Sequence, residues 1–340
     1  MSLWHMRAAR RDDLDTLLDL AAQTGAGFTN LPENRDAMLA RLDWNERSFA
    51  RAENEPDNEL YILILEEAGT GRIGGSAMLF SRIGVRWPFY SYKMAKLSQR
   101  SEELDRTVKL DVLHLVNDFN GASEVGGLFL NPDLRSMGLG GLLGRSRYLF
   151  MGCHRERFAR QVIAELRGHI EEDGTSPFWD GLGGKFFGMK FEEADDFNSK
   201  NGNQFIADLM PKYPIYTALL PESARACIGR PHDSGVPAMR MLEKEGFAFT
   251  GYVDIFDAGP TMVADTERLK TVQAAKSLPV ADIAANVAGS GRGLASMGSL
   301  MSFRAWRTAA TIGEAGLTLP AEEAALMNIK VGDTITYVAS

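Results

Sequence analysis

The hydrophobic positions at the start of the chain predict a strand followed by two helices. A short strand is expected at residues 6–9, and an aspartate at position 12 or 13 can cap a helix whose leucines then fall at helical spacing. TGAGFTNLP, at 24–32, is too rich in turn-forming residues for either element. It is therefore expected to be a loop before a second helix at 35–49.

Apolar runs farther along the chain predict antiparallel strands. ELYILILEE (59–67) and SAMLFSRIGV (76–85) flank a glycine-rich turn and are expected to form a hairpin. A polar stretch at 91–106 is expected to separate this hairpin from DVLHLVNDFNGASEVGGLFL (111–130). The two apolar ends of that segment predict strands paired around its Asn-Asp and Asn-Gly turns.

The remaining pattern alternates helices and strands. A helix is expected to end near residue 160, a buried strand to follow at 161–168, and a short helix leading into a strand at 176–191. Two segments, PFWDGLGGKFF and the later AMRMLEKEGFAF, share one pattern. Each is expected to be a helix that ends at a glycine and is followed by a strand with aromatic residues. This similarity predicts a weak tandem repeat.

The length of 340 residues predicts two domains, at 1–200 and 201–340, because about 100 to 200 residues per domain is usual. The predicted fold is α/β (α+β), with mixed, largely antiparallel sheets flanked by helices and a small strand-rich C-terminal tail. VAGSGRGLASMGS (287–299) is rich in glycine and serine and is expected to be a flexible loop.

Composition indicates an ordinary globular protein, with 45% hydrophobic and 24% charged residues. A net charge of -8 argues against nucleic acid or an anionic membrane as a partner, since both are bound through excess Lys and Arg. The two cysteines form no CxxC pair, so neither a disulfide framework nor a zinc site is expected. Neither a membrane span nor a signal peptide is predicted, and we expect a cytoplasmic protein.

LFLNPDLRSMGLGGLL, at 128–143, carries the first chemical signal. A strand that ends at a glycine-rich turn before a helix is typical of a phosphate site, because backbone N–H groups at a helix start bind anions. No Lys-Ser or Lys-Thr follows the glycines, which excludes an ATP-binding P-loop. A dinucleotide fingerprint is disfavoured because its third glycine position is Leu143.

The turn matches R-x-x-G-x-G and resembles the pyrophosphate loop of the Gcn5-related N-acetyltransferase (GNAT) superfamily. The resemblance implies tandem GNAT-like acyl-CoA-binding units. It also implies that the preceding strand splays from its neighbour and pairs with the pantetheine arm of coenzyme A through Leu128, Phe129 and Leu130. The residues expected at the pyrophosphate are Arg135, Ser136, Met137, Gly138, Leu139 and Gly140.

Further motifs narrow the resemblance to the arginine N-succinyltransferase family. They occur in family order along nearly the whole chain and include TGAGFTNLP, LFLNPD, AELRG, SPFW, LMPKYPIY, GRPHDSG, LEKEGF and YVDIFDAGP. The chain departs from the family at Phe119, where histidine is frequent, and its tail after Ile283 is expected to match poorly. The resemblance implies that succinyl passes from succinyl-CoA to the α-amino group of L-arginine, with succinyl-CoA as co-substrate and no permanently bound cofactor. It also implies a homo-oligomer, or a hetero-oligomer with a paralogous subunit.

An α-amino group must lose a proton before it attacks a thioester, and the leaving thiolate benefits from an acid. Glu124, just before the coenzyme-binding strand, is the candidate base. The resemblance assigns the proton donor to His232, whose imidazole has a suitable pKa. Cys153 is not expected to be a nucleophile, because the side chain of the adjacent His154 points elsewhere on a helix. No His or carboxylate cluster has the spacing of a metal site.

A bound guanidinium requires a carboxylate partner. Asp118, Glu165 and Asp254 are candidates, and the sequence does not choose among them. Arg167 and the loop that ends at Thr29 are candidates for the succinyl carboxylate. Alternatives are an acyltransferase that uses acetyl-CoA, ornithine or another amine, and a non-catalytic acyl-CoA sensor. The presence of both Glu124 and His232 weighs against the sensor.

Overall fold

The computed structural model describes residues 3–23, 30–287 and 292–339. The chain divides into two compact units: unit 1 is Met1–Ser81, Val125–Arg160 and Asp265–Ser340, and unit 2 is Arg82–Glu124 and Gln161–Ala264. These units are interleaved along the chain. The division into an N-terminal GNAT-like acyl-CoA-binding domain at 1–200 and a C-terminal GNAT-like domain at 201–340 stays a prediction.

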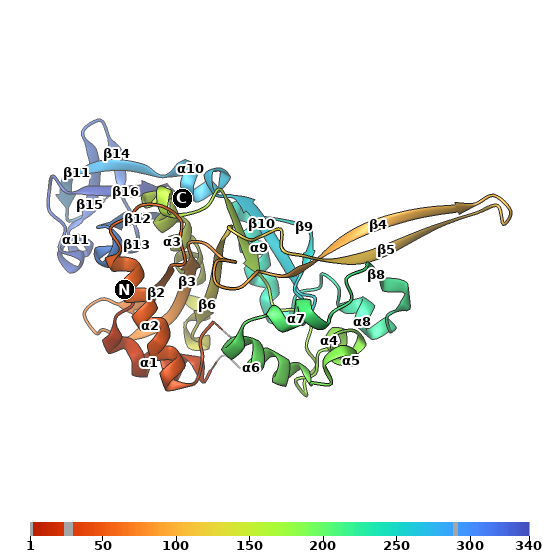
Figure 1. Cartoon of the computed structure of the whole chain (residues 1–340). Coiled ribbons are helices and arrows are strands. Elements are labelled where there is room, and N and C mark those ends of the chain that lie inside the picture. The colour runs from red at the N-terminus through yellow and green to blue at the C-terminus, as the bar shows by residue number, and fades with distance from the viewer. Residues whose placement is uncertain (1–2, 24–29, 288–291, 340) are drawn as a thin grey trace. The chain divides into compact units, whose positions relative to one another are not determined.

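Unit 1 is a sheet with helices packed on it (Figure 1). The order of its strands is β14-β15-β11-β16-β12-β13-β1-β2-β3-β6. Its helices are α1 (Leu14–Ala21), α2 (Arg35–Ala50), α3 (Gly140–Cys153), α10 (Lys270–Ala274) and α11 (Ala321–Met327). Its strands are β1 (Trp4–Ala8), β2 (Leu60–Glu67), β3 (Ile73–Phe80), β6 (Ser123–Leu130), β11 (Lys276–Ala284), β12 (Gly293–Met297), β13 (Arg304–Thr308), β14 (Thr311–Gly313), β15 (Gly316–Pro320) and β16 (Thr334–Val338).

The continuous apolar run of β2 is explained by burial on both faces. Ile62 and Ile64 pack in one core cluster with Leu17 of α1 and Met38 of α2. Tyr61 points the other way and contacts the ring of Phe150 in α3, with ring centroids 5.2 Å apart. Successive side chains of a strand face opposite sides of the sheet, so a strand covered on both sides loses the alternating pattern.

Unit 2 has the strand order β7-β10-β9-β4-β5-β8. It also contains Ser123 and Glu124, the first two residues of β6, which pair in parallel with β7. Its strands are β4 (Ser91–Ser101), β5 (Arg106–Val116), β7 (Gln161–Glu165), β8 (Ile215–Tyr216), β9 (Ala248–Val253) and β10 (Pro260–Asp265). Its helices are α4 (Pro177–Gly181), α5 (Gly184–Phe187), α6 (Phe191–Asn201), α7 (Gln204–Leu209), α8 (Glu222–Cys227) and α9 (Val236–Glu245). The predicted mixed, largely antiparallel α/β fold with a strand-rich C-terminal tail is confirmed.

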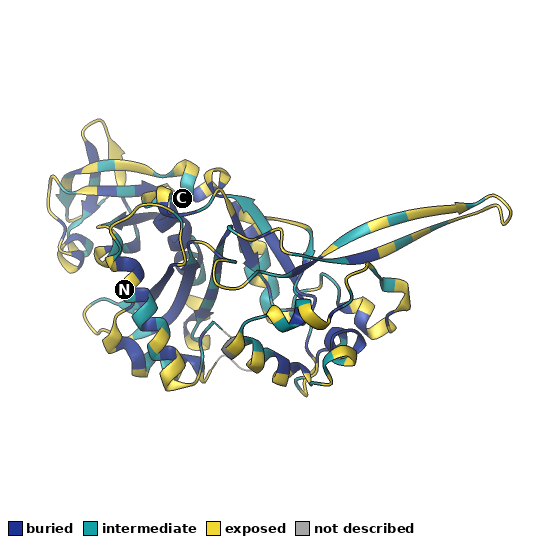
Figure 2. Ribbon diagram, viewed as in Figure 1, coloured by how far each residue is buried: buried dark blue, intermediate teal, exposed yellow. Residues whose placement is uncertain are grey.

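The polar stretch at 91–106 is not a separator, and this prediction was wrong. Most of it is β4, which pairs with β5 along eleven residues and extends with it as an arm, largely exposed toward its tip (Figures 1 and 2). One face of the arm carries apolar pairs such as Leu97 with Leu110, and the other carries the ion pair between Lys96 and Asp111. Because directly paired residues share a face, a thin amphipathic ribbon needs few apolar residues. The expected pairing of the two ends of 111–130 is also wrong, since β5 pairs with β4 and β8.

Two further local predictions differ from the structure. Residues 176–191 contain α4 and α5 and lead into α6, not into a strand. Trp179 of α4 stacks on Phe187 with ring centroids 5.5 Å apart, and its Nε1 donates to the Met189 carbonyl, so the segment folds back on itself. The glycine-rich stretch at 287–299 contains strand β12, while residues 288–291 lie outside the described part of the chain.

Candidate active site

The glycine turn of unit 1 joins β6 to α3. Leu128, Phe129 and Leu130 form the end of β6, and a 3-10 helix at Pro132–Met137 follows. The Asn131 side chain accepts a hydrogen bond from the Asp133 N–H at 3.0 Å and caps this turn. Gly138 has φ +70°, a left-handed conformation that favours glycine, and α3 begins two residues later.

Most of this turn is open to solvent. Arg135, Ser136, Met137 and Gly138 are exposed, whereas Leu139 is buried as an anchor. A Cβ added at Gly138 or Gly140 would meet no atom within 4 Å. The start of α3 therefore presents backbone N–H groups beside open space, which is the arrangement that binds phosphate.

In unit 2, the segment after β7 is held against the loop between β9 and β10. Asp257 accepts hydrogen bonds from the N–H groups of Gly168, at 2.7 Å, and Gly259, at 2.8 Å. A Cβ on Gly259 would lie 2.0 Å from the Leu166 carbonyl oxygen, so only glycine permits this approach. These contacts fix the positions of Glu165 and Arg167 relative to the loop.

Four carboxyl groups gather at this junction. We call Glu165, Asp195, Asp254 and Asp257 the acidic cluster. The pKa values of Glu165, Asp195 and Asp257 are raised chiefly by burial and further by a neighbouring carboxylate. For Asp254 the pKa is likewise raised by burial, although it accepts hydrogen bonds from the N–H groups of Phe256 and Asp257. For Asp195 the raised pKa is about 6. Buried like charges with so little neutralisation favour a cationic ligand.

Two polar atoms at the cluster lack partners. Glu165 Oε1 and Arg167 Nε are buried and make no hydrogen bond within the described residues. Burial lowers the pKa of the Arg167 guanidinium, while Asp257 and Asp195 raise it. A buried polar group without a partner costs free energy, so both atoms are suited to a ligand that supplies the missing contact.

His232 is attached to the same segment. Its backbone N–H donates to the Arg167 carbonyl at 2.7 Å, and Pro231 forms a β-bridge with Gly168. The imidazole Nδ1 lies 2.7 Å from Ser234 Oγ and accepts from the Ser234 N–H at 3.2 Å. These contacts engage Nδ1 and not Nε2. Burial, then the charges of Arg167 and His169, lower the pKa of His232, although Asp233 opposes them.

The other predicted site residues differ in their placement. Glu124, paired with Ile163 of β7, lies near enough to raise the pKa of Glu165 by charge repulsion. Asp118 is exposed and accepts a hydrogen bond from Tyr252 Oη at 2.8 Å, with Lys93 Nζ at 3.5 Å. Asp118 is therefore already neutralised on the surface. Thr29 lies outside the described residues.

Sequence reasoning missed Asp195 and Asp257 as members of the cluster. Asp257 belongs to the YVDIFDAGP motif, which was noted only as a family resemblance, and Asp195 lies on α6 without a local signal. Both become visible only when the fold brings their segments to β7. Within the described residues, no three His, Cys, Asp or Glu side chains are arranged to hold a metal ion.

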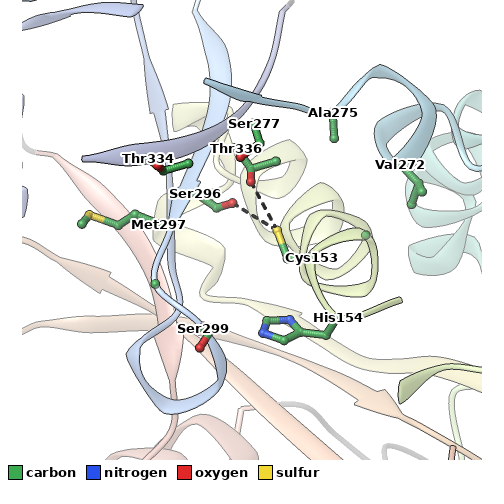
Figure 3. Close-up of a pocket in the computed structure, with 12 residues that line it drawn as sticks. Cys153, His154, Val272, Ala275, Ser277, Ser296, Met297, Ser299, Thr334 and Thr336 are labelled. Carbon is green, nitrogen blue, oxygen red and sulfur yellow. Dashed lines mark hydrogen bonds between the residues drawn. The ribbon is translucent and has the colours of Figure 1, made fainter. Parts of the chain in front are cut away.

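A separate pocket of about 500 Å³ in unit 1 lies at the end of α3 (Figure 3). Cys153 Sγ is 3.7 Å from both Ser296 Oγ and Thr336 Oγ1. His154 turns away from the thiol: its Nε2 accepts from the Leu300 N–H, and its Nδ1 lies 3.0 Å from the Phe150 carbonyl oxygen. The expectation that Cys153 and His154 do not form a nucleophile and base pair is consistent with this geometry.

Comparison with protein-family models identifies two matching regions. The model described as Arginine N-succinyltransferase beta subunit matches residues 4–271, and the model of the C-terminal domain of that subunit matches residues 276–339. The tail after Ile283 therefore matches this family, and the expected poor match there is wrong. In the chain that the structure describes, no helix is long and apolar enough to cross a membrane.

Curated relatives and a solved structure agree with these matches. The chain is 40% identical to Arginine N-succinyltransferase of Citrobacter koseri over 277 residues, which are 82% of this chain and 80% of that protein. It is 41% identical over 279 residues to the protein of the same name from Shigella dysenteriae, with the same shares of the two chains. The structure of arginine/ornithine succinyltransferase subunit AI from Pseudomonas aeruginosa matches 100% of this chain and 99% of its own, with a TM-score of 0.88 and 30% identity.

Proposed function

This chain belongs to the arginine N-succinyltransferase family, and we propose that it transfers the succinyl group of succinyl-CoA to the α-amino group of L-arginine. The observation that carries the choice of a cationic acceptor is the acidic cluster, in which Glu165 Oε1 is buried without a partner. A guanidinium supplies both the positive charge and the N–H donors that this carboxyl lacks.

Coenzyme A is proposed to bind in unit 1. The strand residues Leu128, Phe129 and Leu130 would run beside the pantetheine arm, and the turn at 135–140 would hold the pyrophosphate. The open space beside Gly138 and Gly140 supports this assignment, because phosphate oxygens can then reach the backbone N–H groups. Coenzyme A enters as succinyl-CoA and leaves as the free thiol, so it is not a permanently bound cofactor.

The acceptor is proposed to bind at the acidic cluster of unit 2. Glu165 would hold the guanidinium of L-arginine, with Asp254 as its nearest alternative. Asp118 is the weaker candidate because Lys93 and Tyr252 already engage it. Arg167, whose Nε is buried without a partner among the described residues, is proposed to hold the succinyl carboxylate. A contribution of Thr29 stays a prediction.

The chemistry is proposed to be direct attack in a ternary complex. Glu124 would remove a proton from the ammonium group, and the free amine would attack the thioester carbon. The C–S bond then breaks, the amide remains on the product, and His232 would protonate the leaving thiolate through Nε2. Contact of Nδ1 with Ser234 supports this role, since it orients the ring and keeps Nε2 for the substrate.

One assay tests the function. Purified protein is mixed with succinyl-CoA and L-arginine, and release of free thiol is followed; each substrate is then replaced by acetyl-CoA or ornithine. We expect the fastest release with the first pair. Ornithine is the second candidate acceptor, because the Pseudomonas aeruginosa relative is named an arginine/ornithine succinyltransferase subunit. Coenzyme A binding without thiol release from any pair would contradict an enzyme and support a sensor.

The assembly is proposed to be oligomeric. The family model describes a beta subunit, and the solved relative is named subunit AI. A homo-oligomer or a hetero-oligomer with a paralogous subunit therefore stays the expectation, and the mass of the purified protein in solution would test it. A cytoplasmic location also stays a prediction.

A further inference from the structure

Arg307 of unit 1 lies beside the first turn of α3, and the charges of two further arginines act on it. Arg307 comes from β13, Arg145 from α3 itself, and Arg292 directly precedes β12. Burial lowers the pKa of Arg307, and the charges of Arg145 and Arg292 lower it further. No sequence motif joins these three positions, which belong to different segments of the chain.

The Arg307 guanidinium lies close to α3 because Gly141 has no side chain there. A Cβ on Gly141, the second residue of α3, would lie 2.7 Å from the Arg307 Nη2. Any other residue at position 141 would therefore push the guanidinium away. Gly141 and Arg145 are four residues apart and share one face of α3, so the Arg307 guanidinium lies on the face that also carries Arg145.

The cluster is electrostatically unbalanced. Arg292 pairs with Glu323 at 3.2 Å, and Arg145 Nε donates to Thr271 Oγ1 at 3.0 Å. Arg307 has no ion pair with a carboxylate among residues 3–23, 30–287 and 292–339, and it is only partly exposed. A cation beside the N-terminus of a helix is unfavourable, because this end of the helix dipole is positive. A strongly anionic ligand would reverse each of these unfavourable interactions.

The identity of that anion follows from the neighbouring turn, and this step rests on the proposed function. Gly141 comes directly after the turn at 135–140 that is proposed to hold pyrophosphate. Coenzyme A carries one more phosphate, a dianionic monoester on the ribose, a few bonds from the pyrophosphate. We propose that Arg307, assisted by Arg145, binds the 3′-phosphate of coenzyme A. A planar guanidinium can give two parallel hydrogen bonds to such a group.

The test compares coenzyme A with 3′-dephospho-coenzyme A by titration calorimetry of the full chain. The wild type is expected to bind the dephospho form about 10- to 100-fold more weakly, the range for hydrogen bonds to charged groups. Arg307→Gln should bind coenzyme A weaker by a similar factor, and should bind the dephospho form as the wild type does. Arg307→Lys, which keeps the charge, should recover part of the loss.

Arg304→Gln is the matched control, because Arg304 lies three residues earlier on β13 and faces the other side of the strand. It should leave both affinities unchanged. Equal weakening of both ligands by Arg307→Gln, or no weakening of either, would overturn the assignment. Thiol release by the wild type is measured separately, so a chain that discriminates the two ligands but transfers no succinyl would contradict the proposed function and leave this inference standing.

Discussion

The proposed nucleotide turn in unit 1 and the acidic cluster in unit 2 are built in different ways. The turn consists of consecutive residues, most of them exposed, and it offers backbone N–H groups beside glycines. The cluster is made of the buried Asp257 and three partly buried carboxyl side chains, which come from β7, α6 and the loop after β9. A site made of backbone tolerates most side-chain changes, whereas a site made of buried charges depends on each carboxyl. Side-chain substitutions should therefore be far more costly in the acidic cluster than in the turn.

The largest effect is expected from His232→Ala. General acid catalysis contributes about 100- to 10,000-fold, so kcat should fall within that range. The affinity for coenzyme A, measured by calorimetry, should stay the same, because the coenzyme turn lies on other residues. Ser234→Ala is the milder companion and should lower kcat by less, since the Ser234 N–H still contacts the ring. Full activity in His232→Ala would contradict the proton-donor role.

The next effect concerns the acceptor. Glu165→Gln keeps the shape of the side chain and removes the charge, so the KM for L-arginine should rise about 100-fold, as expected when one partner of a buried ion pair is lost. Asp118→Asn is the matched control and should change this KM by less than about 2-fold, because exposed pairs contribute little. The opposite pattern in steady-state kinetics would move the guanidinium site to Asp118.

A third effect is the pH dependence of folding. The folded protein holds a proton on Asp195 up to a pKa of about 6, whereas the ordinary value is 3.8. The contribution of Asp195 to the free energy of unfolding is therefore fully present below pH 4. It is lost as the pH rises through 6, because the folded protein must then release this proton. With allowance for partial exposure, the free energy of unfolding should fall by about 1 to 2 kcal/mol over this window.

Asp195→Asn isolates this group from the rest of the cluster. The variant should be flatter between pH 4 and 6 in urea denaturation, and it should be more stable than the wild type at pH 7 by about the same 1 to 2 kcal/mol. Glu192→Gln, at an exposed position of the same helix, should leave the pH profile unchanged. Parallel profiles for the wild type and Asp195→Asn would contradict a raised pKa of Asp195 in the folded protein.

The two regions also differ in how far the sequence predicts them. The turn is recognisable in R-x-x-G-x-G, because six consecutive residues contain all that a backbone site needs. His232 and Glu165 were found through family motifs, but Asp195 and Asp257 become members only when tertiary contacts bring α6 and the loop after β9 to β7. The prediction that 91–106 is a separator failed for a related reason. Strand β4 is stabilised by its pairing with β5, and a local run of polar residues gives no sign of this pairing.

The smallest effect tests the claim that the turn depends on backbone conformation. Two glycine-to-alanine substitutions should change the free energy of unfolding in opposite directions. Gly138 and Gly144 both have open space where a Cβ would be, so neither substitution to Ala meets a clash. Gly138 has φ +70°, and Ala there should cost about 1 kcal/mol in the free energy of unfolding. Gly144 lies inside α3, and Ala there should add up to about 1 kcal/mol to the free energy of unfolding.

The same pair of variants should differ in kinetics. Because the turn presents its N–H groups only when Gly138 is left-handed, Gly138→Ala should raise the KM for succinyl-CoA a few-fold, whereas Gly144→Ala should not. Denaturant titration and steady-state kinetics measure the two quantities. Stabilisation by both substitutions would show that the left-handed residue is dispensable and that contacts other than backbone conformation shape the turn.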